Sequence, residues 1–159
     1  MYIWKVDELV EDFRSGAVTQ KEEFKYLLLF TIAMAIACDP ALYIDMSYNH
    51  FDTIGSATGI LISIIGLFFC YKANSSGDNK DFIVRTMCIG LPVLIRTLAI
   101  FIPIFIVAGI LEGAAMATSE SESEPIESTL MQVVLMALMV SFYYYYLSTK
   151  LRNVSSVNA

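Results

Sequence analysis

The stretch Ile54–Tyr71, IGSATGILISIIGLFFCY, contains 18 consecutive residues without a charged side chain. A helix needs about 20 mostly apolar residues to cross the hydrocarbon core of a bilayer, which is about 30 Å thick. The stretch shows no alternation of apolar and polar residues and is too long for a barrel strand. It therefore predicts a transmembrane helix.

Three further apolar segments are long enough to cross a membrane, and the predicted spans are residues 24–46, 54–71, 83–111 and 126–147. Of the 159 residues, 57% are hydrophobic and 16% are charged, against about 45–50% and about 25% in soluble domains. We expect an all-α integral membrane protein, a bundle of four transmembrane helices over residues 19–152. A short cytoplasmic tail, 153–159, follows the bundle.

The basic residues predict the orientation of the chain. Nine of the ten precede the first span, join the second to the third or follow the fourth: Lys5, Arg14, Lys21, Lys25, Lys72, Lys80, Arg85, Lys150 and Arg152. Cytoplasmic loops carry the excess of Lys and Arg in membrane proteins, so both termini are expected in the cytoplasm. The short loops, and a first span that starts too late for a cleavable signal, fit a bacterial inner membrane.

The net charge of -6 comes from the opposite side of the predicted membrane. Eight acidic residues and no basic ones lie there: Asp39, Asp45, Asp52, Glu112, Glu120, Glu122, Glu124 and Glu127. This acidity argues against a nucleic-acid partner. The loop Ser119–Ser128 has two interpretations: a solvated linker, or a contact site for cations or a basic protein at Glu120, Glu122 and Glu124.

Residues 1–18 predict a short amphipathic helix on the cytoplasmic side. Ile3, Val6, Val10 and Phe13 recur at helical spacing, which places them on one face. Two interpretations stand: the helix packs under the bundle, or it docks a cytoplasmic protein partner.

Arg96 is the one basic residue inside a predicted span. It lies eleven residues beyond Arg85, or about 16 Å into the bilayer at 1.5 Å per residue. A charge at that depth costs about 2.5–3.5 kcal/mol on insertion scales, so it needs a partner or a water-filled cavity. Asp39 is the predicted partner. The pair has two interpretations: a structural lock, or part of a transport, gating or ligand site.

Pro92 and Pro103 flank Arg96 on the same span. Each removes a backbone donor, so the helix is expected to be kinked or segmented. Broken helices beside an intramembrane charge occur in transport sites, but structural membrane helices also carry prolines.

Small residues recur along the second span at Gly55, Gly59, Ser63 and Gly66. Such a series lets another helix approach closely. Packing within one chain is the expected use, and a second copy of the chain is the alternative.

Catalytic and cofactor motifs are missing from the sequence. It holds a single histidine, His50, no Cys-x-x-Cys pair and no P-loop, so we expect no metal site, no cofactor and no enzyme activity. The leading hypothesis is a membrane protein that acts in the lipid bilayer by binding a protein partner, at the acidic loop or the N-terminal helix. The alternative is a homo-oligomeric ion channel or transporter with an Arg96/Asp39 pathway.

Overall fold

The computed structural model describes residues 4–37, 48–117 and 129–156, the side chains of 115–117 excepted. Of these residues 88% are helical and none lies in a strand. The helices are α1 (Val6–Ser15), α2 (Gln20–Ala37), α3 (His50–Ser75), α4 (Phe82–Ala117) and α5 (Leu130–Ser155). Three of them, α3, α4 over Phe82–Ala114 and α5, are long and apolar enough to cross a membrane. The described chain is thus all-helical and has the composition of an integral membrane protein.

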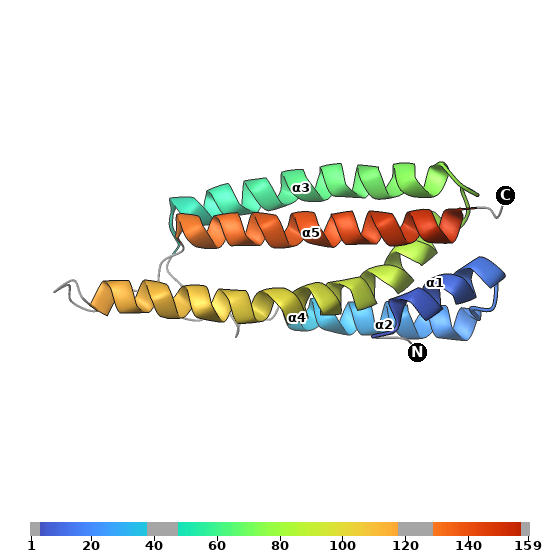
Figure 1. Ribbon diagram of the computed structural model, residues 1–159, viewed down its shortest axis with the longest axis horizontal. Helices are drawn as coiled ribbons and strands as arrows, with labels where there is room; N and C mark the ends of the chain where they lie inside the picture. The colour runs from blue at the N-terminus through green and yellow to red at the C-terminus, as the bar shows by residue number, and fades with distance from the viewer. Residues whose placement is uncertain (1–3, 38–47, 118–128, 157–159) are drawn as a thin grey trace.

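The long helices lie side by side in the order α3, α5, α4, α2 (Figure 1). The most extensive packing joins α3 to α5, and α4 packs on the other side of α5. α1 lies across the end of this row and packs against α5 and α4. The start of α2, the end of α3, the start of α4 and the end of α5 gather at that same end, which is on the right in Figure 1. We call it the basic end, because nine of the ten basic residues lie there.

Side-chain caps set where two of the helices begin. Asn49 accepts hydrogen bonds from the backbone N–H groups of Phe51 and Asp52, and Asp52 accepts one from the N–H of Asn49. This capping box starts α3 at His50. The hydroxyl of Thr129 accepts a hydrogen bond from the N–H of Gln132. This cap starts α5 at Leu130, and residues 126–128 of the predicted fourth span lie outside the described residues.

The first predicted span corresponds to α2 only in part. α2 ends at Ala37, and residues 38–47 lie outside the described part of the chain. Its first six residues include four charges, Lys21, Glu22, Glu23 and Lys25. The stretch Tyr26–Ala37 that follows is apolar apart from Thr31. A fourth membrane span therefore remains a prediction.

α4 is one helix across both Pro92 and Pro103. Its N-terminal part is inclined to the rest in Figure 1. Pro92 is buried, whereas Pro103 is exposed. A proline removes the hydrogen bond to the preceding turn, so Pro92 weakens α4 within the stretch 88–93, which is buried.

The core gathers at the basic end, where α1, α4 and α5 meet. Its fully buried side chains include Val6, Leu9, Ile89, Leu147 and Leu151. Away from this end most large apolar side chains of α3, α4 and α5 are exposed. Exposed apolar surface on this scale is what the acyl chains of a bilayer cover.

Candidate functional site

A buried charge cluster lies in the turn between α3 and α4. The terminal nitrogens Nη1 and Nη2 of Arg85 lie 2.6 Å from the Oδ1 and Oδ2 atoms of Asp78, respectively. Nη1 also donates to the Oδ1 atom of Asn74 at 3.2 Å. Arg85 is 5% exposed and Asn74 is fully buried. Arg85 therefore anchors the turn between α3 and α4.

The end of α5 closes this cluster from the other side. The backbone N–H of Asp78 donates to the carbonyl of Ser155 at 2.9 Å, and the Ser155 hydroxyl donates to the carbonyl of Ala73 at 3.1 Å. At Gly77 a Cβ atom would overlap with the Ser155 backbone, so only glycine fits there. The hydrogen bond from Arg85 lowers the pKa of the Asp78 carboxyl below its ordinary value, although burial opposes this effect.

Arg96 donates a hydrogen bond from Nη1 to the hydroxyl of Tyr146 on α5 at 2.8 Å. Its side chain is half-buried, and no described carboxylate forms an ion pair with it. The predicted partner, Asp39, lies outside the described residues. Glu112, the one acidic residue of α4, accepts hydrogen bonds from Thr129 and from Gln132 at 2.9 Å. The described partner of Arg96 is thus a neutral hydroxyl.

Two of the predicted small residues on α3 face α5 closely. Gly66 is buried, and a Cβ atom there would overlap with the Tyr144 side chain. At Gly55 it would lie 3.5 Å from Cγ2 of Val133. A Cβ at Gly59 would meet no atom within 4 Å, and Ser63 is half-buried. The close approach of α3 to α5 therefore depends mainly on Gly66.

The apolar side of α1 packs against the core of the molecule. Val6, Leu9 and Val10 are buried, and Asp7 forms an ion pair with Lys150 on α5 at 2.5 Å. A partner that binds α1 in this arrangement meets its exposed polar side. The other predicted contact site, Glu120, Glu122 and Glu124, lies outside the described residues.

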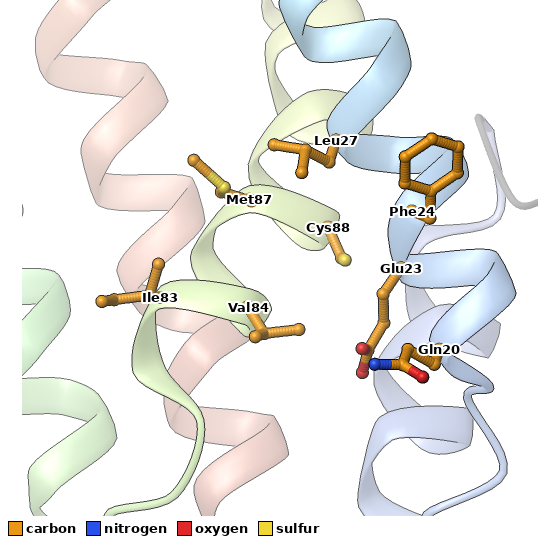
Figure 2. A pocket seen from close by; sticks show the side chains of 8 residues that line it. All are labelled: Gln20, Glu23, Phe24, Leu27, Ile83, Val84, Met87 and Cys88. Atoms are coloured by element: carbon orange, nitrogen blue, oxygen red, sulfur yellow. The ribbon is translucent and has the colours of Figure 1, made fainter.

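A small hollow of about 260 Å³ separates the start of α2 from the start of α4 (Figure 2). Its lining is Gln20, Glu23, Phe24 and Leu27 from α2 and Ile83, Val84, Met87 and Cys88 from α4. The side chains of Gln20 and Glu23 lie together at one end, near Val84, and Cys88 points from α4 toward α2. Glu23 is the only charged residue in the lining. No group of His, Cys, Asp and Glu side chains suited to a metal ion occurs in the described part of the chain.

Sequence reasoning missed the Arg85 cluster and the contact between Arg96 and Tyr146. The available signal for the first was Asp78, seven residues before Arg85 and just ahead of a helix. The second joins residues fifty positions apart, and no sequence pattern links them. Comparison with protein-family models, with curated proteins and with solved structures finds no match for the chain.

Proposed function

We propose that the chain is a multi-pass membrane protein that acts by binding another membrane component, without catalysing a reaction. In this proposal α2 and the residues after it form a fourth transmembrane helix beside α3, α4 and α5, and α1 lies at the interface. The basic end faces the cytoplasm of a bacterial inner membrane, with both termini on that side. The position of nine basic residues at one end of the molecule supports this orientation.

Arg96 carries the proposal of a binding role. A guanidinium group has five N–H donors, and the described hydrogen bond of Arg96 to Tyr146 uses one of them. Unsatisfied donors are costly in hydrocarbon. Ala99 and Ile100, one turn further along α4, are exposed. A transmembrane helix of a partner that rests against these residues brings its carboxylate or carbonyl oxygens to the remaining donors.

A homo-oligomeric channel or transporter is the second candidate. The arrangement of α3, α5, α4 and α2 in a row favours an oligomer. Helices in a row do not surround an ion pathway within one chain, and both edges of the row are left for neighbouring copies. In that case Arg96 and Asp39 line the pathway between copies.

Photo-crosslinking in native membranes tests the leading proposal. The change Ala99→p-benzoylphenylalanine places a crosslinker one turn from Arg96, and the matched control carries it at Ile110, an exposed residue of the same helix. We expect a crosslinked product at position 99 that contains a different protein. Arg96→Leu is expected to abolish this product, and Arg96→Lys, which keeps the charge, is expected to retain it.

Other outcomes of this experiment contradict the proposal. A product at position 99 that survives Arg96→Leu removes Arg96 from the contact. Products made only of this chain, together with ion flux through proteoliposomes of the purified protein, favour the oligomeric channel.

A further inference from the structure

A groove of about 610 Å³ runs along the seam between α3 and α5. All of its lining comes from these two helices. α3 and α5 run in the same direction, and both end at the basic end (Figure 1). On both walls of the groove, residues with higher numbers therefore lie closer to the basic end.

The chemistry of the groove changes along its length. Ile62, Ile65 and Phe69 form an apolar wall on α3. Opposite this wall lie Ser141 and the rings of Tyr144 and Tyr145 on α5. Further along α5 the lining reaches Ser148, Thr149 and then Arg152, the only charged residue of the lining, at the basic end. One end of the groove suits a hydrocarbon chain and the other suits an anion.

The length of the groove matches one leaflet of a bilayer. Each wall covers twelve residues, from Ile62 to Ala73 on α3 and from Ser141 to Arg152 on α5. This is about 16 Å of helix, and half of a hydrocarbon core is about 15 Å. An acyl chain in the groove therefore extends to about the bilayer midplane while its headgroup lies at Arg152.

Arg152 is available for a ligand. Its side chain is exposed, and its guanidinium forms no hydrogen bond or ion pair with the described residues. Two acidic residues of the basic end form ion pairs with other basic residues, Asp78 with Arg85 and Asp7 with Lys150. A guanidinium binds phosphate through two parallel hydrogen bonds, and basic pockets between transmembrane helices bind anionic headgroups.

We propose that this groove binds an anionic phospholipid, with its phosphate at Arg152 and one acyl chain along Ile62, Ile65 and Phe69. A second copy of the chain fits the charge less well. A two-fold pair through this groove places both Arg152 side chains at one level of the membrane, where they repel. The groove does not include Arg96, so a test of lipid binding in the groove is independent of a test of the proposed function.

Native mass spectrometry of the full chain in detergent tests the site. Titration with phosphatidylglycerol is expected to give one retained lipid, and phosphatidylcholine is expected to bind more weakly. Arg152→Gln should weaken the retention of phosphatidylglycerol by about fivefold, the loss expected for one basic contact to an anionic lipid. Lys72→Gln is the matched control, because Lys72 is an exposed cation of the basic end that does not line the groove.

A second pair of variants tests the acyl-chain part of the groove. Ile65→Trp fills the apolar wall and should also reduce retention, whereas Ile64→Trp places the same ring on an exposed residue outside the groove. A phosphatidylglycerol with a photoreactive acyl chain is expected to label residues 62–69.

Three results would overturn the proposal. They are equal losses for Arg152→Gln and Lys72→Gln, equal retention of the two lipids, and displacement of the lipid by inorganic phosphate, which would assign Arg152 to a free anion.

Discussion

Arg85 and Asp78 form a two-pronged ion pair, with both nitrogen–oxygen distances at 2.6 Å. The pair lies where α3, α4 and α5 meet, and the N–H of Asp78 also binds the carbonyl of Ser155 at the end of α5. The Nε atom of Arg85 has no partner among the described residues, so Asp78 supplies most of the compensation for this buried charge. The carboxylate of Asp78 thus holds α4 to the turn after α3, and its backbone N–H links the same turn to the end of α5.

Removal of that carboxylate should destabilise the protein strongly. Asp78→Asn leaves the buried guanidinium without an opposite charge, and we expect the free energy of unfolding to fall by about 3 kcal/mol. Equilibrium unfolding in mixed micelles, followed by circular dichroism, measures it. The control is Asp81→Asn, an exposed acidic residue three positions away, which should change stability by no more than about 0.5 kcal/mol. Similar small effects for both variants would contradict the anchoring role of Asp78.

The same ion pair predicts a pH dependence of stability. The hydrogen bond from Arg85 lowers the pKa of Asp78 in the folded protein below its ordinary value of 3.8. A carboxyl group with a lowered folded pKa contributes stability that is fully present above the unfolded pKa and is lost as the pH falls through the folded pKa. The stability difference between wild type and Asp78→Asn should therefore shrink as the pH falls from about 5 to about 2. A difference that stays constant over this range would be inconsistent with the lowered pKa.

Gly66 and Gly59 should respond differently to the same substitution. A Cβ atom at Gly66 overlaps with Tyr144, whereas one at Gly59 meets nothing within 4 Å. Gly66→Ala should lower the free energy of unfolding by about 1–3 kcal/mol because it forces α3 away from α5. Gly59→Ala should be neutral or stabilising, since alanine has the higher helix propensity. Equal effects at the two positions would show that α3 and α5 do not pack in this register.

The contact between Arg96 and Tyr146 predicts a small but specific loss. Tyr146→Phe removes the hydroxyl that accepts the hydrogen bond from Arg96 and should lower the free energy of unfolding by about 1 kcal/mol. Tyr145→Phe is the control, because this neighbouring ring is 73% exposed. A double-mutant cycle with Arg96→Met should assign the loss at Tyr146 to the pair. Additive effects, with no coupling energy, would rule out the contact.

The apolar runs of the sequence predict the long helices well but their ends less well. Residues 54–71 lie inside α3, yet α3 begins four residues earlier because Asn49 and Asp52 form its cap. The Thr129 cap starts α5 at Leu130, whereas the first residues of the predicted fourth span, 126–128, lie outside the described residues. Hydropathy measures how far an apolar segment extends, whereas a cap depends on individual hydrogen bonds.

The candidate site was less predictable because it depends on contacts between distant residues. Arg96 stands out in the sequence as a charge within an apolar run, but its described partner is Tyr146. Tyr143–Tyr146 are four consecutive tyrosines whose surroundings differ. Tyr144 fills the space at Gly66, Tyr146 binds Arg96 and Tyr145 is exposed. Helical geometry predicts that they point in different directions, but the neighbour that each one meets comes only from the packing of helices.

The central place of α5 in the row has a consequence for the order in which the protein is made. α5 packs against α1, α3 and α4, and the ribosome synthesises it after all three. Gly66 and the Arg85 turn therefore meet their partners on α5 only after the earlier helices have left the ribosome. The last helix organises those before it, so a chain that stops before Leu130 lacks the element around which the others assemble.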